Sequence, residues 1–319
     1  MSLLDTLNNV EKTLSTPTYI EGAILVRENL DSYINRLPLK ETPIRDRLKR
    51  KVGNWLAASW NVMTTLWVGN SAFAEGWTPT EDATGYVRRS ASYKEFGKTK
   101  SITDKMLAAG ANFLEQESEQ IEVAIRETIQ DEEQFIITWD VWVSALQFDW
   151  LSKWITTNVI DDNNNALGFR PDLLNQGIEL AMVNYWVRPT AIYTGYWMQR
   201  AIDDSLSGDV RVNLNAGNEV STWLRVKSFA SMAGNLEFVN TFAIQWDAVT
   251  YVGNTVETLF IVCENTSGQS VIYMEDLYGL GKSNLAKTWA SIKFMVTECT
   301  VLVNRAEEFQ IKISNIRVK

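Results

Sequence analysis

Gly281-Lys282-Ser283 has the residue types that end a phosphate-binding loop, and it follows a predicted strand. A complete loop also needs a glycine five residues before the second one, and this chain has Asp276 there. A carboxylate at that position would repel a phosphate that backbone N–H groups should bind. The sequence therefore argues against nucleotide binding.

The 13 tryptophans suggest a carbohydrate-active enzyme, in which paired carboxylates would act as acid and nucleophile. No spacing singles out such a pair, and the first residues lack the charged and apolar regions of a secretory signal peptide. Packing in a core or between subunits explains the tryptophans better, because most of them sit in apolar clusters. These clusters are Trp55, Trp60 and Trp67, and Trp139, Trp142, Trp150 and Trp154.

Histidine is absent, which removes the commonest general base and the commonest zinc ligand. Cys263 and Cys299 lie in apolar runs and are predicted to be buried free thiols. The polar run 161–165 could ligate calcium, but its spacing is not that of an EF-hand loop. We therefore expect no enzyme activity, no cofactor and no metal.

The net charge of -9 argues against a protein that grips nucleic acid through its phosphates. No apolar run approaches the roughly 18 residues that a membrane span needs. An acidic protein beside DNA is expected to enclose the DNA rather than bind it.

Residues 1–53 are predicted to form a polar, partly helical arm, with an amphipathic helix near residues 24–37. A basic cluster follows: Arg45, Arg47, Lys49, Arg50 and Lys51. It is either a solvated helix face or a segment that docks on an acidic neighbour or scaffold.

Residues 54–100 are predicted to form a long hairpin whose turn includes Glu75. At about 3.3 Å per residue, each arm reaches roughly 50 Å, which is too far to pack on its own small domain. The return arm, 86–100, is strongly basic and carries Arg88, Arg89, Lys94, Lys98 and Lys100.

The clearest element is a helix that begins after Thr103 and runs to about Glu133, because apolar residues recur at three and four positions. Its length would be roughly 45 Å. The opposite face is acidic, which indicates a solvated face or a docking surface for a basic partner. This face carries Glu115, Glu119, Glu122, Glu127, Asp131 and Glu132.

The remainder predicts an α+β chain. Helices are expected over 173–183 and 197–206, and strands dominate 210–262. The closing segments 292–303 and 309–318 are expected to be paired strands around an Asn304-Arg305 turn.

This order of elements resembles the tailed-phage major capsid fold, which encapsulins and the floor of herpesvirus capsids share. Phe73–Gly76 resembles the hairpin tip, and Tyr93–Asp104 resembles the return strand that enters the spine helix. Gln147–Leu151 resembles the Phe-Asp-Gly-Leu stretch of the family, with Trp150 in place of the usual glycine. The segment from Ala286 to Ile316 resembles the final peripheral strands.

The resemblance implies four parts: an N-terminal arm (1–53), an extended hairpin (54–100), a peripheral domain with the spine helix (101–144 and 286–319), and an axial domain (145–285). It implies pentamers and hexamers that form an icosahedral shell around double-stranded DNA. Expected partners are further copies, a scaffolding protein, a portal and a decoration protein, with no membrane. The expected location is the virion capsid, assembled in the host cytoplasm.

An encapsulin-like compartment remains the alternative with the same fold, and a carbohydrate-active enzyme the alternative of another class. In the capsid fold the hairpin of one subunit lies across its neighbour. The basic return arm and the acidic helix face are therefore expected to meet between chains. The expected contact residues are Glu75, Arg88, Arg89, Lys94, Lys98, Lys100, Glu115, Glu119, Glu122 and Glu127.

Overall fold

The computed structural model describes residues 41–65, 72, 75, 77–78, 84–105, 116–138, 144–163, 165, 168–206, 227–246, 249–251, 253–287 and 290–318. The predicted amphipathic helix in the arm, most of the hairpin tip and residues 106–115 of the predicted spine helix lie outside these ranges. Glu115 is among the residues outside them. No helix in the described part of the chain is long and apolar enough to cross a membrane.

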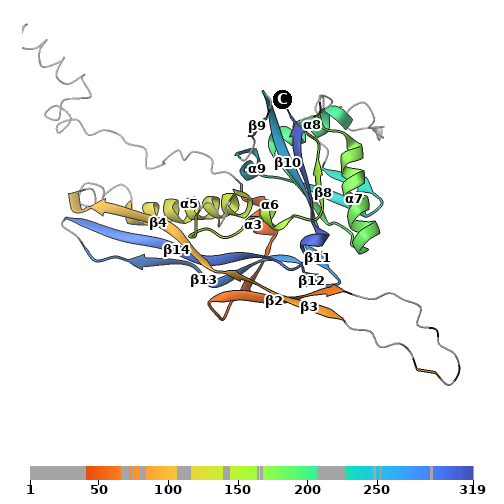
Figure 1. Ribbon diagram of the computed structural model, residues 1–319. Helices are drawn as coiled ribbons and strands as arrows, with labels where there is room; N and C mark the ends of the chain where they lie inside the picture. The colour runs from red at the N-terminus through yellow and green to blue at the C-terminus, as the bar shows by residue number, and fades with distance from the viewer. Residues whose placement is uncertain are drawn as a thin grey trace, which may run out of the picture.

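A four-stranded sheet carries the spine helix (Figure 1). Its two central strands pair antiparallel over most of their length, β4 adds antiparallel to β14, and β1 adds parallel to β13. Helix α5 lies along the β4 and β14 side, where Ala124 is fully buried with Ile102 and Phe294. The elements are β1 (Lys49–Val52), β13 (Ile272–Asn284), β14 (Ser291–Asn304), β4 (Lys94–Thr103) and α5 (Gln116–Thr138).

A second, seven-stranded sheet forms the upper part of the molecule in Figure 1. Its path is β5 (Val159–Asp161), β15 (Ile311–Arg317), β10 (Asn254–Val262), β6 (Ala191–Thr194), β8 (Gly234–Asn240) and β7 (Ser228–Ser231), with β9 (Val249–Tyr251) on β10. Helices α7 (Pro171–Tyr185) and α8 (Tyr196–Leu206) confirm the predicted helices at 173–183 and 197–206. Both pack on the sheet through one buried cluster that includes Ile178, Ile202 and Ile261.

Helix α7 approaches this sheet so closely that residue 177 must be small. A Cβ atom on Gly177 would lie 2.8 Å from Cδ1 of Ile261 on β10. Glycine lowers helix propensity, so its presence here is explained by packing rather than by local structure. The close approach buries Leu174 and Ile178 completely.

The closing strands are not paired with each other, so that prediction is wrong. β14 lies between β13 and β4, whereas β15 lies between β5 and β10 in the other sheet. Each strand therefore uses both of its edges for other partners. The 3₁₀ helix η1 (Glu307–Phe309) stands between them, where the prediction had a tight turn.

The predicted return arm of the hairpin is divided between two sheets. β2 (Ala57–Thr65) pairs with β3 (Gly85–Ser92) in a two-stranded ribbon, and β4 starts at Lys94 in the four-stranded sheet. The ribbon projects away from both sheets in Figure 1. Its base is nevertheless part of the core, because Trp60 is 6% exposed and its ring centroid lies 5.9 Å from that of Trp154.

One buried cluster joins the two sheets. It contains Phe260 and Val262 of the second sheet together with Met274 and Leu302 of the first. Cys263 and Cys299 are free and buried, as predicted. The remaining short elements are α3 (Pro43–Arg47), α6 (Leu151–Trp154), α9 (Phe242–Trp246), β11 (Asn265–Thr266) and β12 (Gln269–Ser270).

Candidate functional site

The basic residues of β4 contact the spine helix of their own chain. Alternate residues of a strand share a face, so Phe96, Lys98 and Lys100 all point toward α5. Nζ of Lys98 lies 2.6 Å from Asp131, and Nζ of Lys100 lies 2.8 Å from Glu127. Phe96 packs edge-on against Phe135 with ring centroids 5.2 Å apart. The predicted attraction between return arm and acidic face thus occurs, at these positions, inside one subunit.

The arginines of the ribbon lie on opposite faces of β3, as neighbouring strand residues must. Arg89 faces the body, where its guanidinium lies 3.8 Å from Glu307 and 3.6 Å from Glu308. Arg88 is exposed and donates a hydrogen bond to the hydroxyl of Ser59 at 3.0 Å. Of the two, Arg88 is the one whose charge is available to a neighbouring molecule.

The other predicted contact residues are distributed over β4, helix α5 and the hairpin turn. Lys94 donates to the backbone carbonyl of Ala145 at 2.6 Å, and Glu122 pairs with Arg126 one turn along α5. Glu119 lies half-buried on the same helix, and Glu75 is an exposed turn residue near the ribbon tip. The acidic face of α5 is therefore partly neutralised by its own chain, rather than simply solvated.

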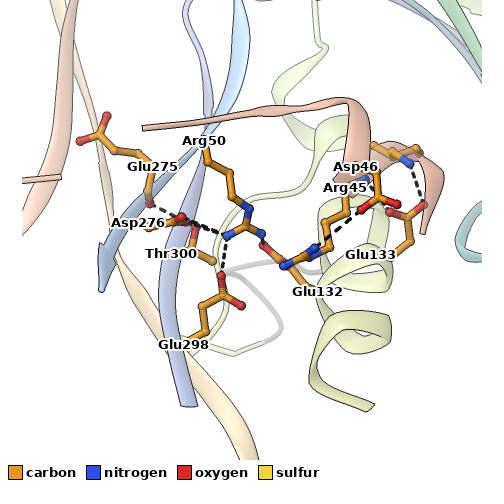
Figure 2. A network of polar contacts seen from close by, with 10 residues as sticks. Arg45, Asp46, Arg50, Glu132, Glu133, Glu275, Asp276, Glu298 and Thr300 are labelled. Carbon is orange, nitrogen blue, oxygen red and sulfur yellow. Dashed lines mark hydrogen bonds and ion pairs between the residues drawn. The ribbon is translucent and has the colours of Figure 1, made fainter. Parts of the chain in front are cut away.

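The basic cluster at the end of the predicted arm docks inside its own chain, a result that neither sequence interpretation anticipated. Figure 2 shows Arg50 reaching Glu132 of α5, Asp276 of β13 and Glu298 of β14. Arg45 also pairs with Glu132, whose side chain is fully buried. We call these five residues the Arg50 network. It fastens α3 and β1 to the helix and to the sheet at once.

The electrostatics of the Arg50 network depend on burial. Burial by itself would lower the pKa of Arg50, but the adjacent carboxylates, Glu132 first, raise that pKa above its ordinary value. Burial raises the pKa of Glu298, and the charge of Glu132 raises it further. A buried network of this kind is costly to break at one member, because the remaining charges stay buried without their partner.

Glu133 of α5 makes a second set of contacts with α3, beside the Arg50 network. Its carboxylate accepts hydrogen bonds from the backbone N–H of Ile44 at 3.2 Å and of Arg45 at 2.7 Å, in the first turn of α3. It also accepts one from the hydroxyl of Thr241 at 2.7 Å, just before α9. Helix α5 therefore holds α3 by its backbone as well as by its arginines.

Arg47 links the same segment to the second sheet. Its guanidinium lies 2.6 Å from Glu237 of β8 and 2.8 Å from Glu264, which follows β10. Glu264 also accepts a hydrogen bond from the hydroxyl of Tyr193 at 2.7 Å. The hydrogen bond to Glu264, with the further bond to Glu237, raises the pKa of Arg47 above its ordinary value. One short segment thus joins both sheets.

The two segments that resemble ligand-binding motifs in sequence have other roles in the structure. Gly281-Lys282-Ser283 lies inside strand β13, where the extended backbone cannot curl around a phosphate. In the acidic run 161–165, Asp162 pairs with Arg170 at 2.6 Å. These residues stabilise the local fold.

No protein-family model and no curated protein matches the sequence. The comparison with known proteins therefore rests on the fold. Over 95% of this chain and 99% of the other, the structure superposes on the capsid of a native GTA particle, with a TM-score of 0.67 and 11% identity. It matches the capsid of the cyanophage P-SCSP1u over 92% of this chain and 94% of that one, with a TM-score of 0.62 and 10% identity. The chain has the capsid fold.

The structure is also similar to an encapsulin. The holo-SrpI encapsulin complex from Synechococcus elongatus PCC 7942 matches over 94% of this chain and 96% of that one, with a TM-score of 0.63 and 11% identity. The capsid fold therefore covers nearly the whole chain, including both sheets. The α+β assignment and the predicted fold are confirmed.

Proposed function

We propose that this chain is a major capsid protein that assembles into pentamers and hexamers and forms the icosahedral shell of a tailed phage. The observation that carries the proposal is the ribbon on a body with the capsid fold. Met63 and Tyr86 are directly paired across the ribbon and are 50% and 65% exposed. An isolated two-stranded ribbon is only marginally stable in water, and this one ends in an exposed apolar pair, so a second chain is the natural support for it.

The domain proposal follows the capsid fold with adjustments from the sheets. We propose the same four parts: an arm (1–53), a hairpin (54–100), a peripheral domain (101–144 and 286–319) and an axial domain (145–285). Because β1 and β13 belong to the four-stranded sheet and β15 pairs with β10, the proposal counts β1 and β13 with the peripheral part and β15 with the axial part. The ribbon as a free element extends only to Ser92.

Contacts between copies are proposed to use the ribbon of one subunit and helix α5 of the next. The proposal uses two exposed residues, Arg88 of the ribbon and Glu75 of the hairpin turn, and Glu119 and Glu122 of α5, together with Glu115, which lies outside the described residues. Arg89, Lys94, Lys98, Lys100, Glu122 and Glu127 already have partners in their own chain. They would contribute by shaping the two surfaces, and an exposed ion pair between copies would add only about 0.2–1 kcal/mol.

The shell is proposed to enclose double-stranded DNA without binding it, because 39 acidic residues outnumber 30 basic ones. Its further partners would be a scaffolding protein, a portal and a decoration protein. Assembly would take place in the host cytoplasm, and the mature protein would be part of the virion.

Electron microscopy of the purified protein tests the proposal directly. Closed particles or rings of five and six subunits are expected, from the chain alone or with the proteins encoded beside it. A chain that remains monomeric at high concentration in both settings contradicts the proposal.

An encapsulin-like protein would form the same kind of closed particle as a phage capsid protein. The two functions differ in what the particle contains. Particles isolated from their natural source should protect double-stranded DNA from nuclease if the chain is a phage capsid protein. Particles that contain an enzyme and no DNA would favour the compartment instead. The neighbouring genes give a second test, since a portal and a terminase belong with a capsid.

A further inference from the structure

Helix α7 ends in a left-handed residue that is not glycine. Trp186 has a φ of 57°, and its backbone N–H donates to the carbonyl of Met182 at 3.1 Å. The turn directs the next residue, Val187, into a buried cluster with Cys263 and Val271. This turn requires only a backbone conformation, and glycine adopts that conformation without steric cost.

The side chain at this position is unfavourable for folding in two respects. A bulky residue in the left-handed region strains the backbone, and the indole of Trp186 is 90% exposed to water. Glycine or asparagine would serve the helix end better on both grounds. A residue that costs the fold something and contributes little to its core indicates a function on the surface.

The surroundings of Trp186 have the composition of a protein contact. Val183, one turn earlier on α7, is 62% exposed, and Arg188 is exposed two residues later. Tryptophan and arginine are enriched among residues that dominate binding energy at protein interfaces. We call Val183, Trp186 and Arg188 the Trp186 surface.

We propose that the Trp186 surface is a contact site for a second copy of this chain. The inference rests on the proposed function and names a surface that the ribbon does not supply. The chain carries another exposed apolar patch at the corner between β1 and β2. There Val52, Trp55 and Leu56 are 81%, 80% and 88% exposed.

The two patches cannot cover each other within one molecule, because α7 and the corner where β2 begins lie far apart (Figure 1). Two different patches on one chain are what a head-to-tail contact needs, and such contacts form rings when the rotation between copies closes. The net charge of the chain favours a second copy of the chain, rather than nucleic acid, as the partner that binds the Trp186 surface. With a net charge of -9, a neighbouring copy offers carboxylates to Arg188, whereas the chain as a whole repels phosphate.

The test compares Trp186→Gly and Trp186→Asn with a matched control, Ser267→Gly. Ser267 is an exposed turn residue with a φ of 47°, so its replacement relieves the same kind of backbone strain without removing an aromatic surface. All three variants should melt at or above the temperature of the wild-type subunit. The Trp186 variants should need about tenfold more protein to reach half-maximal assembly, as measured by light scattering.

Ser267→Gly should assemble like the wild type, and Trp186→Phe should recover part of the loss because it keeps an aromatic side chain. Normal assembly of both Trp186→Gly and Trp186→Asn, beside a wild type that assembles, overturns this inference and leaves the proposed function intact. A wild-type chain that never associates with itself overturns both. Asparagine tolerates the left-handed region, so the pair of variants separates a contact effect from damage to the helix end.

Discussion

Glu257 accepts a hydrogen bond from the backbone N–H of Met198 at 2.9 Å, so a carboxylate on β10 holds the first turn of helix α8. Glu257 is 1% exposed, and its second oxygen has no hydrogen-bond partner among the residues that the structure describes. A Cβ atom at residue 195 would lie 2.7 Å from the carboxylate, so any residue larger than glycine there would displace it. The second sheet therefore contains a tightly enclosed acid.

This acid predicts a dependence of stability on pH. Burial raises the pKa of Glu257 from 4.5 to about 7, and the bond from Met198 offsets only part of that effect. The fold therefore favours the protonated form. Its stabilising contribution is complete below the unfolded pKa near 4.5 and is lost as pH rises through about 7.

Glu257→Gln should remove this component of the pH dependence. Glutamine keeps an acceptor for the Met198 N–H and carries no charge, so the variant should gain up to about 3 kcal/mol at pH 8 and little at pH 4.5. Urea unfolding at both pH values measures the difference. Glu264→Gln is the control: this carboxylate pairs with Arg47, so its loss should destabilise the protein at pH 8. Equal pH profiles for Glu257→Gln and the wild type would contradict the prediction.

Glu132 and Glu127 offer a matched comparison on one helix. Glu132 is fully buried between Arg45 and Arg50, while Glu127 forms one partly exposed pair with Lys100. Glu132→Ala should cost about 3–5 kcal/mol of unfolding free energy, because two arginines lose a buried partner. Glu127→Ala should cost less than about 1 kcal/mol. Similar losses, measured by denaturant titration, would show that the Arg50 network contributes no more than a surface pair.

The local elements could be predicted from sequence because their signals are local. The apolar periodicity of α7 and α8 repeats within one or two helical turns, and both helices were found where it placed them. The actual partners of β14 and β15 could not be inferred in this way. Their closeness in sequence favours a hairpin, whereas the actual partners come from distant segments.

In the candidate site, too, local features could be predicted from the sequence and long-range contacts could not. Opposite charges on the return arm and the spine helix could be read from the sequence, but a pattern does not say whether they meet within one chain. Lys98 and Lys100 meet α5 inside the subunit because β4 joins the sheet beneath that helix. The Arg50 network was missed for a related reason: Arg50 and Glu298 are 248 residues apart in sequence.

Covalent cross-links between subunits are not expected. Lysines of the return arm and Asn304, with Glu307, are the residue types that such a link would need. Asn304 is fully buried and Lys98 pairs with Asp131, so their reactive atoms do not face a neighbour. Particles boiled in detergent with reductant should give a single monomer band. A ladder of multimers that resists both treatments would contradict this expectation.

Arg88 is the ribbon residue whose reversal should separate assembly from folding. A reversal of both Arg88 and Arg89 would confuse the two effects, because Arg89 lies beside Glu307 and Glu308 of its own chain. Arg88→Glu should leave the melting temperature unchanged, since Arg88 is exposed, and should lower the yield of particles at low salt. High salt should weaken wild-type assembly in the same direction, because it screens exposed charges.

Arg89→Glu is the matched control on the neighbouring position. It places a third carboxylate beside Glu307 and Glu308, so it should lower the melting temperature of the subunit before assembly begins. Circular dichroism melts and particle yield, measured on both variants, distinguish the two roles. If Arg88→Glu assembles at low salt with the wild-type yield, the ribbon arginine has no part in contacts between copies. A loss of yield that accompanies a lower melting temperature would instead assign Arg88 to the fold.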